Sequence, residues 1–135
     1  MNLADAMDEI ATQVDTIDGL RVYGWPVGSV TPPAAIMTYP GEYTFDATYG
    51  RGMDRLTLLL AVVVGRATER TARDLLGAYV DGSGASSIKA VVEAGTYTAF
   101  HTVRVVGVDF GEVTIAGTSY VGATFELDIA GQGTA

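Results

Sequence analysis

The sequence predicts a single α+β domain over residues 1–135, in which helices pack on one face of a largely antiparallel, mixed β-sheet. Three observations lead to this prediction. The 135-residue chain is 48% hydrophobic, which suits one core. Its periodicities follow the order helix, three strands, two helices and two strands, with no internal repeat and no linker. The last two strands alternate between apolar and polar residues, so we expect them to form a long C-terminal β-hairpin.

The first helix is expected over residues 2–16, where apolar residues recur at spacings of three and four. Asn2 suits the N-cap position, and Gly19 can end the helix. This spacing places an apolar stripe on one side of the helix. The stripe consists of Leu3, Met7, Ile10, Val14 and Ile17.

Two short strands are expected next, at Arg21–Tyr23 and at Ala34–Tyr39. The segment Thr31-Pro32-Pro33 between them cannot be helical, because each proline restricts the residue before it. Pro40-Gly41 stops the second strand.

Residues 42–53 show no helical period, and we expect an extended, partly mobile arm there. Aromatic, methionine and arginine side chains gather in and just after this arm, and interface cores favour these residue types. Two alternatives stay open: the arm contacts a neighbouring chain, or it folds back onto its own domain. The candidate contacts between subunits are Tyr43, Phe45, Tyr49, Arg51, Met53 and Arg55.

Residues 54–64 predict a central strand. On one face of this strand, the polar Thr57 is followed by apolar residues from Leu59 onward. The second half of the strand should therefore be covered by other elements on both faces. The other face is apolar throughout. It is formed by Leu56, Leu58, Leu60, Val62 and Val64.

Two helices are expected after the central strand. Thr68 suits the N-cap of the first, which the glycine-rich segment 81–84 ends. A short helix then begins at Ser86 or Ser87 and ends at Gly95. The apolar residues at helical spacing are Ala72, Leu75, Leu76, Tyr79 and Val80 in the first helix, and Ile88, Val91 and Val92 in the second.

The hairpin is predicted from residues 101–115 and 121–129. The apolar phase of the first strand shifts at Val105-Val106, which indicates a β-bulge. Residues 116–119 turn the chain, and the tail 131–135 should fray. In the second strand Val121, Ala123, Phe125, Leu127 and Ile129 face inward, and Thr124, Glu126 and Asp128 face outward.

The charge balance argues against tight binding of nucleic acid. The net charge is −8, with 16 acidic and 8 basic residues. The basic residues are scattered, whereas binding through phosphates requires clusters of lysine and arginine. This acidity favours the close passage of DNA without binding.

The composition also bears on the compartment. The chain has no cysteine, which excludes disulfides and thiolate chemistry and fits a reducing environment. Its first residues lack the basic and apolar regions of a signal peptide. The longest apolar run, Leu58–Val64, is too short to cross a bilayer. We therefore expect no membrane partner, and a protein made in the cytoplasm that stays there or in something assembled there.

Few residues suggest catalysis. His101 is the only histidine, and its place at the start of a strand favours a surface or interface role. Acidic residues of the last hairpin could hold a cation or form an acid/base pair, but a polar surface is the simpler interpretation. The glycine-rich segments match no phosphate-binding motif. We expect no enzyme activity, metal or cofactor. The acidic residues concerned are Asp109, Glu112, Glu126 and Asp128.

In this arrangement the chain resembles the tail terminator and tail-completion proteins of long-tailed, siphovirus-type phages, especially those of actinobacteria. The resemblance lies in the order and spacing of segments and covers nearly the whole chain. The N-terminal helix is followed by Val22-Tyr23-Gly24-Trp25-Pro26, Thr31-Pro32-Pro33-Ala34, Tyr43-Thr44-Phe45, Tyr49-Gly50-Arg51-Gly52-Met53-Asp54-Arg55, Asp81-Gly82-Ser83-Gly84, Ser87-Ile88-Lys89-Ala90-Val91 and Tyr120-Val121-Gly122-Ala123.

The resemblance implies a virion protein of the tail or neck, assembled in the host cytoplasm. Such a protein forms a ring, typically of six copies, that caps the tail tube and docks to the head connector. DNA passes through the ring, and no catalytic residues are implied. The arm at 42–53 could contact the next subunit, the tail tube or the connector.

Two further expectations concern the ring itself. Ring closure needs a heterologous interface, in which two different patches of the subunit meet. We expect the arm to supply one patch and a sheet edge or helix the other. Carboxylates lining the lumen would repel phosphates within a Debye length of about 8–10 Å. We expect some of the candidate residues Asp109, Glu112, Glu126 and Asp128 to face the lumen.

Competing hypotheses remain at this point. A head–tail connector or the tail tube protein of the same virion would share these features, and a tube protein would form filaments rather than single rings. A small-molecule-binding α+β domain is a candidate of a different class, and it would require a pocket with convergent polar groups.

Overall fold

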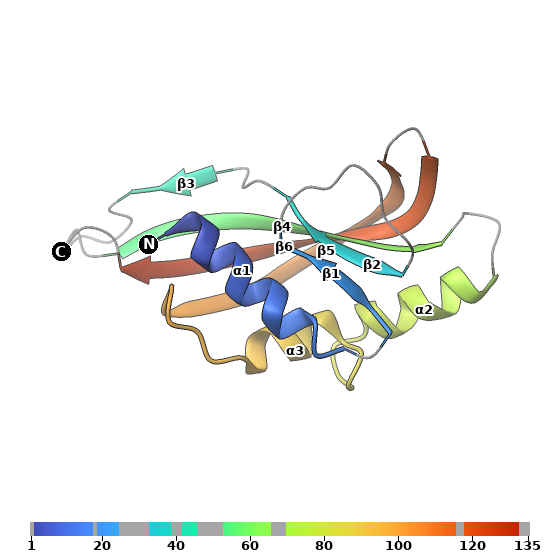
Figure 1. Ribbon diagram of the computed structural model, residues 1–135, viewed down its shortest axis with the longest axis horizontal. Helices are drawn as coiled ribbons and strands as arrows, with labels where there is room; N and C mark the ends of the chain where they lie inside the picture. Colours follow the sequence, from blue (N-terminus) through green and yellow to red (C-terminus); the bar gives the residue numbers. More distant parts are fainter. Residues whose placement is uncertain are drawn as a thin grey trace.

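The computed structural model describes residues 2–17, 19–24, 33–38, 42–45, 53–65, 70–115 and 118–132. Within them the chain forms three helices and a six-stranded, mostly antiparallel sheet, which confirms the predicted α+β class (Figure 1). The helices are α1 (Leu3–Val14), α2 (Arg70–Val80) and α3 (Ile88–Ala94). The strands are β1 (Arg21–Tyr23), β2 (Ala34–Met37), β3 (Glu42–Thr44), β4 (Met53–Gly65), β5 (Thr102–Ile115) and β6 (Thr118–Gln132).

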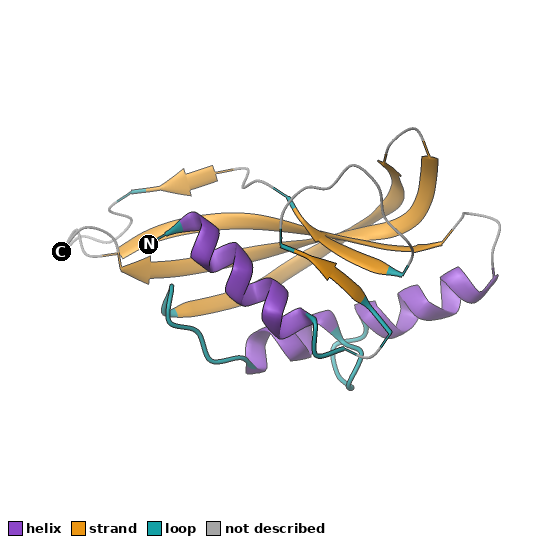
Figure 2. Cartoon of the chain, viewed as in Figure 1, coloured by secondary structure: helices purple, strands orange, loops and turns teal. Residues whose placement is uncertain are grey.

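The strands follow the order β1-β2-β4-β6-β5, with β3 paired to β4 beside β2. Only the β1–β2 pair is parallel among these strands, so the sheet is mixed (Figure 2). β2 pairs with Leu60–Val63 and β3 with Arg55–Thr57, so both lie along the same edge of β4. The long strands β5 and β6 form the predicted C-terminal hairpin.

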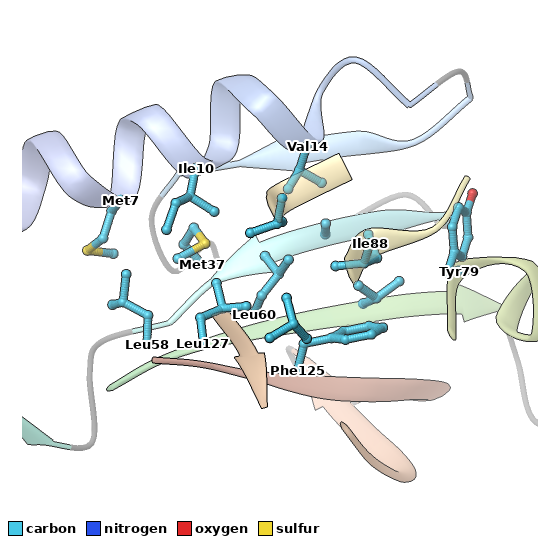
Figure 3. Packing of buried hydrophobic residues seen from close by; sticks show 14 of the residues in the cluster. Met7, Ile10, Val14, Met37, Leu58, Leu60, Tyr79, Ile88, Phe125 and Leu127 are labelled. Carbon is cyan, nitrogen blue, oxygen red and sulfur yellow. The ribbon is translucent and has the colours of Figure 1, made fainter. Parts of the chain in front are cut away.

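The main core lies between the helices and one face of the sheet. Every second residue of β4 and β6 points into it, because side chains alternate along a strand. Figure 3 shows residues of α1 facing residues of β4 and β6, with Ile88 of α3 and Tyr79 of α2 in the same cluster. Burial of each large aliphatic side chain contributes about 1.5–3 kcal/mol. The cluster includes Met7, Ile10, Val14, Met37, Leu56, Leu58, Leu60, Val62, Phe125, Leu127 and Ile129.

A smaller cluster lies on the opposite face of the sheet. Ala34, Ile36 and Val63 are buried there, and Tyr23 and Tyr120 pack against them. The second half of β4 is therefore covered on both faces, as its sequence predicts.

The helix ends follow local rules. The Asn2 side chain accepts a hydrogen bond from the Asp5 amide (3.0 Å) and caps α1. Gly19 adopts a φ of 79°, which glycine tolerates better than other residues. The buried Ser87 caps α3 by accepting a hydrogen bond from the Ala90 amide (3.1 Å). The expected cap of α2, Thr68, lies outside the described residues.

Polar side chains join α1 to distant parts of the chain. The Glu9 carboxylate accepts hydrogen bonds from the amide (2.9 Å) and hydroxyl (2.6 Å) of Thr98 and from the Ala99 amide (2.7 Å). The Thr98 hydroxyl lowers the pKa of Glu9 below its ordinary value, and both amides act in the same direction. The Gln13 side chain donates to the Val91 carbonyl (2.9 Å). These contacts fix α1 against α3 and against the segment before β5.

The predicted bulge in β5 is confirmed. Val105 pairs with Leu127 and Gly107 with Glu126, so Val106 is an extra residue. Its insertion keeps Val105 on the helix-covered face.

The structure bears on both the arm and the tail. Residues 42–44 of the extended arm form β3, which pairs with β4, so this part of the arm follows the second alternative and folds back onto its own domain. A hydrogen bond from the Tyr43 hydroxyl to the buried Asp54 carboxylate (2.8 Å) helps to hold β3 there. Residues 46–52 lie outside the described residues. The tail does not fray at Gly131, because this residue pairs with Asp54 and β6 continues to Gln132.

Candidate interaction surfaces

A polar groove lies on the face of the sheet opposite the helices. Side chains at alternating positions of β3, β4 and β6 point to this face, and the bulge adds Val106 of β5. The groove is open and has a volume of about 440 Å³. We call it the polar groove. Its lining residues are Glu42, Thr44, Arg55, Thr57, Val106, Glu126 and Asp128.

The groove contains both signs of charge. The Arg55 guanidinium forms an ion pair with the Asp128 carboxylate, and both side chains are partly exposed. An exposed pair of this kind contributes about 0–1 kcal/mol to stability. Arg104 lies directly opposite Asp128 in the β5–β6 register. The face therefore has an excess of carboxylates that basic residues interrupt.

The four acidic residues proposed for a lumen do not share one face. Glu126 and Asp128 point away from the helices, and Asp109 lies opposite Thr124, which is on the same face. Glu112 is three positions from Asp109 on a strand without a bulge between them, so it points to the other face. Three of the four candidates therefore share the face without helices, and the expectation that some of the four face a lumen stays a prediction.

The residues predicted to contact another subunit differ in how exposed they are. Tyr43 is partly buried and its ring lies 4.7 Å from that of Phe45, measured between centroids. Burial, followed by the hydrogen bond to Asp54, raises the pKa of Tyr43 to about 12. Met53 is half-buried in β4, and Arg55 lies in the polar groove. Among the apolar members that the structure describes, Phe45 is the exposed one, with 74% of its surface accessible. Tyr49 and Arg51 lie outside the described residues.

A second groove lies between α2 and the distal half of β5. Phe110 of β5 is 62% exposed and forms one wall. Leu76, Gly77 and Val80 of α2 also line it, and the volume is about 360 Å³. We call this the α2 groove. Its complete lining is Arg73, Leu76, Gly77, Val80, Asp81 and Phe110.

Sequence reasoning missed the α2 groove. Its residues come from two elements separated by α3, and only the β5–β6 register places Phe110 beside α2. One signal was present in the sequence: Gly77 interrupts a helical pattern in which glycine is unfavourable.

His101 lies apart from both grooves. It is exposed, and its backbone amide donates to the Ala130 carbonyl (2.9 Å). It lines neither the polar groove nor the α2 groove. The same described residues hold no group of three histidine or acidic side chains placed to bind a metal ion.

No helix among the described segments is long and apolar enough to span a membrane. In comparisons with known proteins, no protein-family model and no curated protein matches this chain.

Proposed function

We propose that this protein is a structural component of a long-tailed phage virion, a tail terminator. In this proposal, copies of the chain form a ring, typically of six, that caps the tail tube and docks to the head connector. DNA passes through the lumen. The order and spacing of the segments of the chain, which resemble that family, support this proposal.

The observation that carries the proposal is the separation of two exposed apolar surfaces on one small domain. Phe45 lies beside β3, whereas the α2 groove lies at the distal half of β5. Two different surfaces at separate places are what a heterologous interface requires, and heterologous interfaces close into rings when the rotation allows it. Single exposed apolar residues are common on protein surfaces, so the proposed ring depends on the two surfaces being different and separate.

The charge of the sheet face supports the part of the proposal that concerns DNA. Asp109, Glu126 and Asp128 point to the face without helices, and the whole chain carries a net charge of −8. If this face lines the lumen, its excess of carboxylates repels phosphates at short range. Arg55 and Arg104 on the same face are each placed beside Asp128, which reduces their attraction for DNA.

Electron microscopy of the purified protein, together with sedimentation velocity at increasing concentration, tests the proposal. We expect single rings of uniform diameter. Filaments would favour a tail tube protein instead, because tube proteins polymerise without limit. A protein that stays monomeric at the highest concentration tested would contradict the ring.

A second measurement addresses the lumen. We expect no mobility shift of duplex DNA by the protein, even at low salt, where electrostatic binding is strongest. Tight, salt-dependent binding would contradict the proposal that DNA passes without being held.

A further inference from the structure

β5 gives the sheet a long edge. It is the last strand in the order β1-β2-β4-β6-β5, it extends over 14 residues, and β6 is the described strand with which it pairs (Figure 1). Alternate backbone N–H and C=O groups of an edge strand point away from the sheet, where they can pair with a strand of another chain. Native proteins therefore carry features that protect such edges.

The first part of this edge has the composition of a segment that pairs readily. Arg104 is the one charged residue within positions 103–108, and it lies opposite Asp128 in the β5–β6 register. Segments of about six residues with high β-propensity and low net charge are those that form sheets between chains. Valine is enriched in β-strands, and positions 103–108 hold four of them. These are Val103, Val105, Val106 and Val108.

The Glu93 side chain covers the edge within this segment. Its carboxylate accepts a hydrogen bond from the Val105 amide (3.0 Å). Glu93 belongs to α3, which packs against β5, so the acceptor comes from the helix layer rather than from a strand. The Val105 amide is thereby satisfied as it would be by the carbonyl group of a neighbouring strand. While Glu93 holds this amide, a second chain cannot accept a hydrogen bond from it.

Lys89 holds the Glu93 carboxylate in place. The Lys89 ammonium group lies 2.7 Å from each oxygen of this carboxylate, one helical turn away on α3. The hydrogen bond from Lys89, followed by that from the Val105 amide, holds the pKa of Glu93 below its ordinary value, so the group is ionised at neutral pH. Both side chains are partly exposed, and an exposed ion pair contributes little to stability. The effect of Glu93 on the edge is therefore more direct than its effect on stability.

The β-bulge lies next to the covered amide. Val106 is the extra residue of this bulge. A bulge disrupts the regular ladder, and charged side chains and bulges are both means by which natural sheets protect their edges. The charge of Arg104, the covered amide of Val105 and the bulge at Val106 thus occupy three consecutive positions of β5. This coincidence favours protection of the edge as the role of the Glu93 contact.

We infer that Glu93 is a gatekeeper of the β5 edge. By accepting the Val105 amide, its carboxylate keeps residues 103–108 from pairing with a β-strand of a second copy of the chain. Beyond the bulge, Asp109 and Glu112 place a carboxylate on each face of β5, so a second β5 would meet like charges there. This inference goes beyond the proposed function and does not depend on it. Electron microscopy of the wild type decides the ring, whereas substitutions at the edge decide the gatekeeper.

Hydrogen exchange of the full chain, followed by NMR at low protein concentration, tests the covered amide. In Glu93→Ala the Val105 amide loses its acceptor, and we expect it to exchange about tenfold faster or more than in the wild type. In Glu93→Gln the side-chain amide oxygen can still accept, so the exchange rate should stay close to that of the wild type. An unchanged exchange rate of the Val105 amide in Glu93→Ala would overturn the inference.

Sedimentation velocity and thioflavin T fluorescence test the consequence for association. We expect Glu93→Ala to form large, thioflavin-binding species at concentrations where the wild type and Glu93→Gln form none. Ser87→Ala is the control for lost stability, because it removes the cap of the same helix and leaves the Glu93 contact in place. It should not form these species. If Glu93→Ala aggregates no more than Ser87→Ala does, the edge needs no gatekeeper and the inference fails.

A second substitution separates pairing at the edge from other aggregation. Lysine on an edge strand opposes pairing, and Val106 is 48% exposed, so Val106→Lys places a lysine at the bulge. The double variant Glu93→Ala, Val106→Lys should no longer form the large species, although its Val105 amide still lacks an acceptor. Large species that persist in the double variant would not arise from the β5 edge, and this result would also overturn the inference.

Discussion

Deletion of Val106 should destabilise the fold through the register of β5, although the residue itself is 48% exposed. Val106 is the extra residue of the bulge between the Val105–Leu127 and Gly107–Glu126 pairs. Without it, the side chains of residues 102–105 point to the opposite faces of the sheet, while those of the rest of the strand keep their faces. Val103 and Val105 would then point away from the core, and Arg104 would point into it.

The magnitude follows from the burial of the two valines. Val105 is 8% exposed, and Val103 packs against the core but is only partly buried. Complete burial of a valine contributes about 1.5–3 kcal/mol, so their loss should cost about 2–5 kcal/mol. The Val105 amide would also lose its hydrogen bond to the Glu93 carboxylate (3.0 Å). This loss is a large part of the roughly 5–15 kcal/mol that stabilises a typical domain.

Urea unfolding followed by circular dichroism measures the effect. The control is Val106→Thr, which keeps the bulge and should change stability by no more than about 0.5 kcal/mol. We expect the deletion variant to unfold at a much lower urea concentration, with a melting temperature lower by roughly 10 °C or more. If the deletion and the substitution unfold at the same urea concentration, the bulge does not set the register and the reasoning fails.

Three further predictions concern single side chains. Ser87→Ala removes the cap of α3 and should lower the unfolding free energy by about 1 kcal/mol, whereas Ser86→Ala should change it little; thermal denaturation compares the two. The Thr98 hydroxyl lowers the pKa of Glu9 below its ordinary value of 4.5. The ionised Glu9 carboxylate therefore stabilises the fold fully above pH 4.5, and this stabilisation is lost as the pH falls through the lower pKa of the folded state. Acid titrations of stability should therefore be flatter for Glu9→Gln, and unchanged curves would argue against this role. Gly95→Ala places a Cβ 2.6 Å from a tyrosine hydroxyl and should cost about 1–3 kcal/mol in urea unfolding, whereas Gly82→Ala has open space and should be tolerated.

The long strands and the helices could be predicted from the sequence because their patterns extend over many residues. The alternation of β6 predicts which residues are buried, since each of Ala123, Phe125, Leu127 and Ile129 is at most 2% exposed. The phase shift in β5 likewise predicts its bulge. In such segments buried residues recur at the period of the helix or strand, so the local sequence pattern is sufficient to predict the element and its buried face.

The short strand β3 could not be predicted in the same way. Three residues, Glu42–Thr44, are too few to show a period. Their conformation is set by pairing with Arg55–Thr57 and by the contact of Tyr43 with Asp54, both of which are tertiary. The same limit applies to Glu112, because the face to which it points depends on its phase relative to Asp109 in the β5–β6 register.

The candidate surfaces were the least predictable part of the molecule. Phe45 was identified from its residue type, but its separation from the α2 groove follows only from the registers of β3, β5 and β6. Phe110 has the phase of a core residue, since it lies opposite the buried Ala123. It nevertheless lines the open α2 groove and is 62% exposed, so its burial depends on where α2 lies.

The residues that stabilise the domain differ from those proposed for the interface, and this separation makes the proposed interface testable. The side chains that bury the most surface lie between the helices and the sheet, and none of them lines the α2 groove. Phe45, Gly77 and Phe110 are all exposed, so changes to them remove little of the core. Substitution at Gly77 even gains helix propensity, because glycine is unfavourable inside α2. A variant can therefore be more stable as a monomer and less able to associate, and this opposition distinguishes a lost interface from a damaged fold.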